Sequence, residues 1–566
     1  MDGRRLAALG WVAAAAAAHL ALAAGFIRAS APTYDEAVHL ASGYSYWRTG
    51  RYVLNVNDHP PLAEMASALP LLAMRPDLAP ITRATERERQ FEFSKDFLYR
   101  NRRDPDAMVR AARWAGLLLW TAILLSAVAA WAWRAGGPVA AAAAAWTCAL
   151  LPAFLSNSAL ATTDAAGAAF SFAAFALAYG AFAEPRPGAP PWRAAALAGA
   201  ATGGALASKF SAVQVPVLLL ALAAFANWRW RALPWRRFAL LAGLYGLAAF
   251  LVLAAAYRFA HVGLFFGGLR ETLARLDVGR HSFAWGRYSE QGTWWYFPFA
   301  LAVKTPVAAL VLAVCGAALW KGRSERCRAW LLAPPALMLL AAMAGKVQIG
   351  VRHVLPVLPF LAVAAGLGVE ALWRRGGRAA LAAVALLAWQ GASVLRAQPH
   401  QLAYFNEAAG GPAGGYALLA DSNLDWGQAL KPLAVRLKAE GNPPVYLAYF
   451  GTADPAYYGV RYVPAAPALD VKHPGTGDDP SASERVLLAI SSTHLQSVYF
   501  RDHALFDWLK LRRPAWVSGH SIFVYDLTKD ADGMKRLARF LGLMGSPDEG
   551  RRLWERATAA PPARPK

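Results

Sequence analysis

The chain has 566 residues, of which 57% are hydrophobic, and it carries a formal net charge of +22 at pH 7. Such an apolar composition excludes a set of soluble domains and is typical of a protein with many membrane-spanning helices. The basic residues stand in short segments between apolar runs rather than in one region, so the charge does not indicate nucleic-acid binding.

Apolar runs recur through the first 396 residues of the chain. An α-helix needs about 20 predominantly apolar residues to cross the hydrocarbon core of a bilayer. By this criterion we expect an α-helical polytopic membrane protein with about eleven transmembrane helices, near residues 6–28, 111–133, 137–155, 161–183, 194–208, 211–227, 238–260, 295–320, 329–345, 354–373 and 379–396.

Lys and Arg residues are concentrated in alternate loops between these segments, for example Arg236 and Arg237, and Arg374 and Arg375. The positive-inside rule assigns such loops to the cytoplasm. The N-terminus is therefore expected in the cytoplasm, and everything after the eleventh segment on the external side.

The chain is expected to form two regions. Residues 1–396 would be the membrane domain, with external loops at about 29–110 and 258–294, and residues 397–566 a soluble external domain. The second region alternates strand-like runs ("PPVYLAYFG", "ERVLLAISS", "SIFVYDL") with helix-like runs ("WGQALKPLAVRLKAEG", "DGMKRLARFLGLMG"), which predicts a small α/β domain.

Acidic residues follow the first apolar segment directly, in "YDEAVHLASGYSYW". This stretch predicts an amphipathic helix at the membrane surface, with Asp35 and His39 one turn apart on the same face. Alternatively, Asp35 and Glu36 only favour a helix N-terminus and stay in solvent.

Further polar residues stand near other predicted helix ends. Asp58 and His59 precede Pro-Pro in "NDHPPL" and are suited to bind a divalent cation or to position a substrate, although their spacing does not decide between these roles. Asp164 begins the fourth segment, either as a functional acid or as an ordinary acid at a helix N-terminus. Asp421 and Asp425 are interpreted as helix caps.

Four cations stand at the external ends of predicted membrane helices: Arg113, Lys209, Lys304 and Arg352. A single cation at such a place usually snorkels to the interface. Four of them opposite carboxylates indicate a site for an anionic lipid headgroup. His281, within an aromatic-rich segment, is a candidate polar contact.

Several motifs, taken in order, resemble the GT-C superfamily of integral-membrane glycosyltransferases, and most closely glycosyltransferase family 39, which includes bacterial protein O-mannosyltransferase-like and lipid A aminoarabinose transferase-like enzymes. The motifs are "YDEAVHLASGYSYWRTGRY" with "HPPL", "ALATTDAAGAAF", "GALASKFSA", "GRYSEQGTWWYFPFALAVKTP", "IGVRHVLPVLPFL" and "LAYFNEAAGGPAGGYALLADSNLDWGQALK". The resemblance implies transfer of a sugar from a polyprenyl-phosphate carrier to an acceptor at the external face of the bacterial cytoplasmic (inner) membrane.

The resemblance also implies roles for single residues. Asp35 would be the general base, with Glu36 and Asp164 in the same acidic site. Arg113, Lys209, Lys304 and Arg352 would bind the phosphate of the sugar carrier, and His39, Asp58, His59 and His281 the substrates. Relatives carry an acid and a Lys before "PPL", where this chain has Asp58 and His59, so a divalent cation held by Asp35, Asp58 and His59 stays an open alternative.

The expected partners are a polyprenyl-phosphate sugar, the lipid bilayer and an acceptor that the sequence does not specify: a protein, a lipid or a glycan. Two other functions are compatible with many membrane spans. One is a glycolipid transporter or flippase, although the acidic residues stand at one membrane face rather than at the midplane between repeated halves. The other is a non-catalytic protein of envelope assembly.

Overall fold

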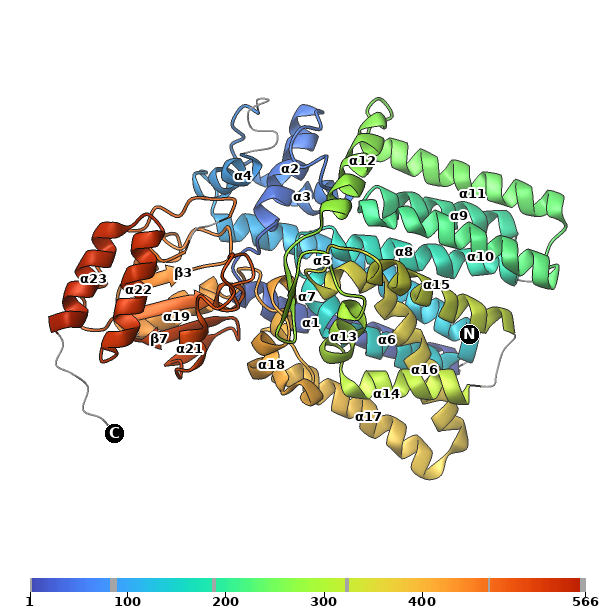
Figure 1. Cartoon of the computed structure of the whole chain (residues 1–566). Coiled ribbons are helices and arrows are strands. Elements are labelled where there is room, and N and C mark those ends of the chain that lie inside the picture. The colour runs from blue at the N-terminus through green and yellow to red at the C-terminus, as the bar shows by residue number, and fades with distance from the viewer. Residues whose placement is uncertain (1–2, 82–88, 186–189, 321–324, 467–468, 560–566) are drawn as a thin grey trace.

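The computed structural model describes residues 3–81, 89–185, 190–320, 325–466 and 469–559. Long helices form a bundle on one side of the molecule, and a β-sheet with helices on both faces forms the other (Figure 1). Between them lie short helices and loops, which come from widely separated parts of the chain.

Within the described residues, seven helical segments are long and apolar enough to cross a membrane. They are α1 (Gly3–Ala29), α5 (Pro105–Gly136), α8 (Asp164–Ala178) with η2 (Tyr179–Ala183), η3 (Phe210–Val213) with α10 (Gln214–Trp230), α11 (Trp235–Ala256), η4 (Val351–Val357) with α16 (Leu358–Arg375), and α17 (Gly377–Arg396). The chain is therefore a multi-pass membrane protein.

Two bent pairs of helices raise the number to nine if each pair is one span. They are α6 (Pro138–Ala149) with α7 (Pro152–Ser158), bent by 65°, and α13 (Tyr296–Lys304) with α14 (Val307–Leu319), bent by 110°. Pro152 and Pro306 stand at the two bends. Proline has no backbone N–H and clashes with the preceding turn, so a continuous helix cannot pass through it undisturbed.

The other two of the eleven expected segments are helices that do not meet the criterion for a span. They are α9 (Pro191–Leu206) and α15 (Glu325–Met343). With 16 residues, α9 is about 24 Å long, shorter than the roughly 30 Å of hydrocarbon that it would cross. The uncharged part of α15 begins only after Arg328.

The segment predicted as the first external loop folds into helices. It contains α2 (Glu36–Thr49), α3 (Leu62–Met74) and α4 (Gln90–Tyr99). The predicted helix after residue 34 is therefore present, but residues 36–46 of α2 are buried on every side. The surface-bound amphipathic helix is thus wrong, because α3 and α4 pack against α2.

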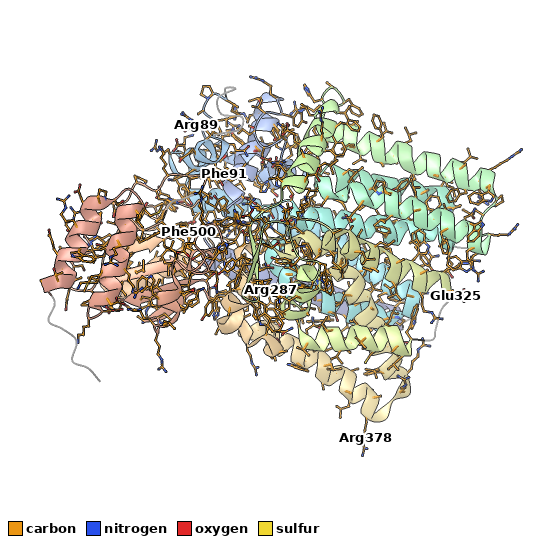
Figure 2. The ribbon with its side chains drawn as sticks, viewed as in Figure 1. Arg89, Phe91, Arg287, Glu325, Arg378 and Phe500 are labelled. Atoms are coloured by element: carbon orange, nitrogen blue, oxygen red, sulfur yellow. The ribbon has the colours of Figure 1, made fainter. Side chains whose placement is uncertain are left out.

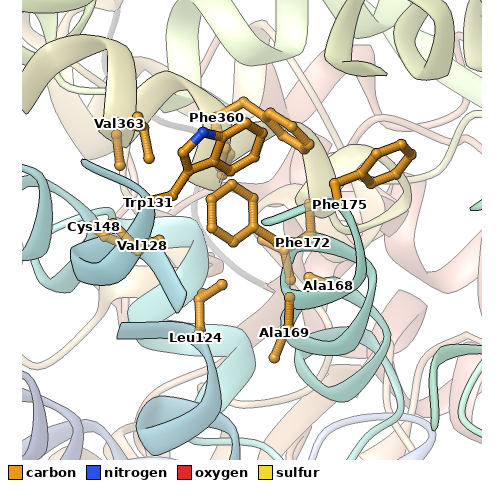
Figure 3. Packing of buried hydrophobic residues seen from close by; sticks show 14 of the residues in the cluster. Leu124, Val128, Trp131, Cys148, Ala168, Ala169, Phe172, Phe175, Phe360 and Val363 are labelled. Carbon is orange, nitrogen blue, oxygen red and sulfur yellow. The ribbon is translucent and has the colours of Figure 1, made fainter. Parts of the chain in front are cut away.

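The segment predicted as the second external loop contains α12 (Gly263–Val278) and a hairpin of β1 (Ser282–Ala284) and β2 (Arg287–Ser289). The core of the bundle is rich in alanine and aromatic residues. In Figure 3, Trp131 of α5, Phe172 of α8 and Phe360 of α16 meet at its centre, and the rings of Phe172 and Phe360 are 4.9 Å apart. This packing holds together the helices that carry the candidate site.

The C-terminal part of the chain contains the predicted α/β fold. Its sheet has the order β4-β3-β5-β7-β6. The strands are β3 (Val445–Ala448), β4 (Tyr462–Pro464), β5 (Leu487–Ser491), β6 (Trp516–Ser518) and β7 (Ile522–Asp526). The β4–β3 and β3–β5 pairs are parallel, and β5–β7 and β7–β6 are antiparallel.

Each face of this sheet is covered by helices because successive strand residues point to opposite sides. On one face, Val445 and Leu447 pack with Leu433 of α19 (Leu430–Ala439). On the other, Tyr446 and Leu488 pack with residues of α22 (Ala531–Leu543) and α23 (Pro547–Ala559). The remaining short helices connect the bundle to the sheet or the strands to one another: η5 (Gln401–Ala403), η6 (Glu407–Ala409), α18 (Gly411–Gly414), η7 (Gly415–Ala417), η8 (Asp421–Asn423), α20 (Ser492–Leu495) and α21 (Asp507–Lys510).

Candidate functional site

A row of alternating charges lies where the bundle meets the C-terminal region. Nη1 of Arg352 is 3.3 Å from a carboxylate oxygen of Asp35 and 3.6 Å from one of Asp164. The other carboxylate oxygen of Asp164 accepts a hydrogen bond from Lys209. The four residues come from three helix starts and a turn, so distant parts of the sequence supply one compact site.

The members of this row differ in their access to solvent. The side chain of Asp164 is 2% exposed, whereas that of Asp35 is 22% exposed. Asp164 holds two cations in place, and two charges that pair with good geometry offset the cost of their burial. Asp35, at the end of the row, is the more exposed of the two carboxylates.

Arg352 is held on both sides by the C-terminal region. Its Nε donates to Oγ of Ser422 at 3.1 Å, and its guanidinium lies 4.1 Å from the ring centre of Trp426. Ser422 reaches this position because Gly350 has no side chain, since a Cβ there would be 2.2 Å from Oγ of Ser422. The planar guanidinium is suited to such a site because it can stack and donate in its plane at once.

Glu36 and Arg113 form a separate, fully enclosed ion pair. Both side chains are at most 1% exposed, and Nη2 of Arg113 is 2.7 Å from a carboxylate oxygen of Glu36. The guanidinium has five N–H groups, and it makes five hydrogen bonds: two to Glu36 and three to the carbonyls of Ile27, Ser30 and Ala31.

This pair changes the interpretation of both residues. Burial raises the pKa of the Glu36 carboxyl, but Arg113 and two backbone N–H groups outweigh burial and hold it below its usual value. Glu36 is therefore not a solvated acid at a helix start. Arg113 has no N–H left for a lipid phosphate, so the expectation that it binds the phosphate does not agree with this geometry.

Lys304 also lies away from an open site. Its ammonium donates to the carbonyls of Leu402 and Asn423 and lies 4.4 Å from the ring centre of Phe405. The residue is 3% exposed. Lys304 thus fastens α13 to the chain after the last membrane helix, and these buried contacts do not agree with the predicted phosphate contact.

His39 and His59 belong to a buried polar network behind Asp164. Nδ1 of His39 is 2.8 Å from the carboxylate of Glu64, and Asn55 donates to the same oxygen at 2.5 Å. The rings of His39 and His59 are 4.9 Å apart. His59 in turn lies 3.2 Å from the hydroxyl of Thr163, next to Asp164.

Asp58 points the other way, into a cavity of about 380 Å³ lined by Asn55, Asn57, Gln90 and Arg275 among others. It accepts hydrogen bonds from Gln90, at 2.8 Å, and from Arg275. Over the residues that the structure describes, no three His, Cys, Asp or Glu side chains are placed to hold a metal ion. Asp35, Asp58 and His59 do not fit the three-ligand site considered above, since each has a different partner.

His281 is more exposed than the other predicted residues. Its side chain is 43% exposed, lies 3.4 Å from Glu290 and has its ring edge toward Tyr499. The structure thus brings Asp35, Asp164, Lys209 and Arg352 together, with His59 beside them. Glu36, Arg113 and Lys304 do not join this group, because they form buried contacts elsewhere in the protein.

Several residues near Asp35 escaped the sequence analysis. The phenol of Tyr499 donates to Asp421, and the Arg280 guanidinium lies 5.8 Å from the centre of the Tyr499 ring. Tyr34 donates to Asp470 at 2.6 Å. The only visible signal was the basic Arg280 in a segment rich in aromatic residues. The contact of Tyr499 with Asp421 joins residues 78 positions apart, and that of Tyr34 with Asp470 joins residues 436 positions apart, so no local pattern reveals them.

Asp421 and Asp425 are not helix caps of the kind expected. Asp421 starts η8 with a φ of 55° and binds Tyr499, and no side-chain cap hydrogen bond precedes η8. Asp425 is fully buried and accepts a hydrogen bond from the backbone N–H of Thr493 at 3.1 Å. Burial raises the pKa of Asp425 to about 7.

Comparison with solved structures identifies the fold. The structure of ArnT from Cupriavidus metallidurans bound to undecaprenyl phosphate aligns with a TM-score of 0.52 over 91% of this chain and 98% of that one, at 13% identity. The same ArnT in the apo state aligns with a TM-score of 0.47 at 14% identity, over 92% and 98% of the two chains. The apo oligosaccharyltransferase of Archaeoglobus fulgidus gives 0.48 at 14% identity, over 83% and 61%.

No family model matches the sequence, and no curated protein is significantly similar to it. The likeness to the first of these structures extends over nearly the whole length of both chains. The chain therefore has the fold of the GT-C membrane glycosyltransferases, as its motifs predict.

Proposed function

We propose that this chain is a glycosyltransferase that moves a sugar from a polyprenyl-phosphate carrier to an acceptor, with Asp35 as the general base. The observation that carries the proposal is the row from Lys209 through Asp164 and Arg352 to Asp35, which ends in its most exposed carboxylate. The GT-C fold and the binding of undecaprenyl phosphate by the similar ArnT support it.

In the proposed reaction, a nucleophilic group of the acceptor attacks the anomeric carbon of the sugar. A new bond forms there as the bond between that carbon and the phosphate oxygen breaks. Asp35 takes the proton from the nucleophile, and the electron pair of the broken bond leaves with the polyprenyl phosphate. A carboxylate in this role contributes roughly 10²–10⁴-fold to the rate.

Arg352 and Lys209 are the cations that we propose to stabilise the departing phosphate. Their side chains are 11% and 14% exposed, so they are less completely buried than those of Arg113 and Lys304. Both are fixed in advance by Asp164, and charges held in place before the reaction need no reorganisation when negative charge develops.

The remaining predicted residues have supporting roles in this proposal. Asp58 faces the cavity of about 380 Å³ beside Gln90 and Arg275, where amide, carboxylate and guanidinium groups suit the hydroxyls of a sugar. His39 and His59 hold the segment between that cavity and Asp164. The proposed location is the bacterial cytoplasmic membrane, with the N-terminus in the cytoplasm and the site external. The acceptor is a protein, a lipid or a glycan.

Transfer from radiolabelled polyprenyl-phosphate sugars tests the proposal. We expect Asp35→Asn to lower product formation by roughly 10²–10⁴-fold while the protein still inserts and folds. Asp96→Asn is the matched control, because Asp96 is exposed on α4 and its ion pair among the described residues is with Arg100, at 3.3 Å. Full activity of Asp35→Asn would remove Asp35 from the reaction. Translocation of the carrier without a new glycosidic bond would instead identify a transporter.

A further inference from the structure

A second cleft lies at the end of the bundle that is far from the candidate site. We call this end the distal end, and it comprises the start of α1 and the ends of α5, α14 and α16. The cleft has a volume of about 1470 Å³. These helices run from one end of the bundle to the other, and Asp35 follows the opposite end of α1. The cleft is therefore separated from the candidate site by the length of the membrane helices.

Arginines and tryptophans dominate the polar and aromatic lining of this cleft. Arg5 of α1, Arg134 of α5, and Arg374 and Arg375 of α16 face two carboxylates, Glu184 and Glu370. The lining thus has an excess of two positive charges. Trp133 and Trp320 also line the cleft, and tryptophan is enriched where membrane proteins meet lipid headgroups.

The two carboxylates are already committed to two of the arginines. Glu184 lies 3.6 Å from Arg134, and Glu370 lies 2.6 Å from Arg374. Within the described part of the chain, no carboxylate lies at ion-pair distance from Arg5 or Arg375, and both are exposed. The excess charge of the cleft therefore resides in these two side chains.

Helix electrostatics explain one of these residues but not the other. Arg375 ends α16, where a cation interacts favourably with the negative end of the helix dipole. Arg5 lies in the first turn of α1, where the dipole disfavours a cation. The dipole of α1 therefore does not stabilise the charge of Arg5, which an anion bound in the cleft would offset.

Exposed apolar side chains surround the cleft. Leu9, which lines it, is 52% exposed, and Trp373, beside Arg374, is 50% exposed. Arg378 and Glu325 stand at the same end of the bundle, far from Phe91 and Phe500 near the candidate site (Figure 2). The cleft therefore combines a cationic centre with apolar helix surfaces of the kind that face lipid chains.

We propose that this cleft binds the headgroup of an anionic phospholipid, with Arg5 and Arg375 contacting its phosphate. Basic pockets between membrane helices suit such headgroups because their phosphate pairs with guanidinium while the acyl chains stay in the bilayer. The site is distinct from the proposed sugar-transfer site, and it does not depend on that function.

Native mass spectrometry of the purified full-length protein tests the site with phosphatidylglycerol and phosphatidylcholine of matched chains. Each basic residue near a lipid surface strengthens binding of an anionic lipid by about fivefold. The measured preference is the ratio of phosphatidylglycerol binding to phosphatidylcholine binding. In the Arg5→Gln/Arg375→Gln variant we expect this ratio to fall by about fivefold for each arginine removed. Arg5→Lys/Arg375→Lys keeps the charge and should retain most of the preference.

The matched control is Arg237→Gln/Arg378→Gln, which removes two exposed arginines outside the cleft lining at the same end of the bundle. It should keep the wild-type preference. An equal loss in the control would mean general surface attraction and would overturn the proposal. So would unchanged binding by Arg5→Gln/Arg375→Gln. Displacement of the lipid by inorganic phosphate at the same concentration would identify an ion site instead.

Discussion

Arg352 touches two carboxylates, a serine hydroxyl and an indole ring at once. A single planar group that donates in its plane and stacks on its face can do this, and an ammonium cannot. The residue sets the distance between Asp35 and Asp164, so its shape as well as its charge matters for the candidate site.

We therefore predict that Arg352→Gln lowers the maximal rate of sugar transfer by roughly 10²–10³-fold, the usual effect of removing one fixed stabilising group. Arg352→Lys should recover part of that loss, since it restores the charge without the planar fork. Rates at saturating sugar carrier measure both effects. Wild-type rates for Arg352→Lys would show that charge alone is sufficient.

Asp425 gives a prediction about pH. Burial raises its pKa from 3.8 to about 7 in the folded protein, so between these values the folded state binds more protons than the unfolded state. The free energy of unfolding therefore falls as pH rises through this window. Asp425→Asn keeps an acceptor for Thr493 and removes the titration, so its apparent Tm should fall less between pH 5 and pH 8 than that of the wild type. Equal falls would exclude Asp425 as the source.

The site residues that could be predicted from sequence are those whose position in the chain is itself unusual. Asp164 and Lys209 are charged residues next to apolar membrane helices, and Asp35 follows the first membrane helix, α1. Glu36 and Arg113 have the same appearance in sequence. Their separate role depends on carbonyls and N–H groups of other segments, which no local pattern reveals.

The start of α2 is held against α5 by the buried Glu36–Arg113 pair, which therefore positions the neighbouring Asp35. Breaking a buried ion pair leaves an uncompensated charge and costs about 3–5 kcal/mol, whereas replacing both partners with apolar residues is often close to neutral.

From this pair we predict that Glu36→Met and Arg113→Met each destabilise the protein strongly. The double variant Glu36→Met/Arg113→Met should be destabilised by much less than the sum, because neither charge is left alone. Thermal unfolding of the purified proteins in one detergent measures the three values. Additive losses would mean that the two residues stabilise the fold independently.

The apolar runs correctly predicted where helices lie, but they did not predict which helices are long enough to span the membrane. All eleven expected segments contain helix, but α9 is too short for a span and packs against α8 and α11. Its Gly199 and Gly203 bring it close to α11, where a Cβ would lie 2.1 Å and 2.4 Å from backbone oxygens of that helix. Composition shows that a segment is apolar, but not whether lipid or another helix covers it.

The whole molecule is joined around Asp35 by contacts between the bundle and the C-terminal region. The N–H of Ala31 donates to the carbonyl of Gln428 at 3.0 Å, and that of Tyr34 donates to the carbonyl of Trp426 at 2.8 Å. The Thr452 hydroxyl donates to the carbonyl of Tyr34 at 2.8 Å. These contacts span about 400 positions in the chain, so the sequence could predict the two regions but not their joint contribution to one site.

Gly350 lies at this junction, and its replacement tests whether the C-terminal region positions Arg352. A Cβ at residue 350 would lie 2.2 Å from Oγ of Ser422, and Ser422 is itself held by the carbonyl of Ile349 at 2.8 Å. In Gly350→Ala either the Ser422 hydroxyl or η4 must therefore shift, and either shift disturbs the hydrogen bond that positions Arg352. We predict a loss of sugar transfer of up to about 10²-fold, because a misplacement of about 1 Å can have that effect.

Two further variants separate displacement from a general effect of adding a methyl group. Gly246→Ala should leave transfer unchanged, since its Cβ would meet nothing within 4 Å. Gly350→Ala/Ser422→Ala removes the hydroxyl that clashes, and the Cβ of residue 422 is at an ordinary 3.4 Å, so activity should partly return. It should not return fully, because Arg352 then lacks its hydrogen bond to Ser422. If the double variant is no more active than Gly350→Ala, the junction does not act through the Ser422 contact, and Arg352 is positioned by the two carboxylates of the bundle and by the ring of Trp426.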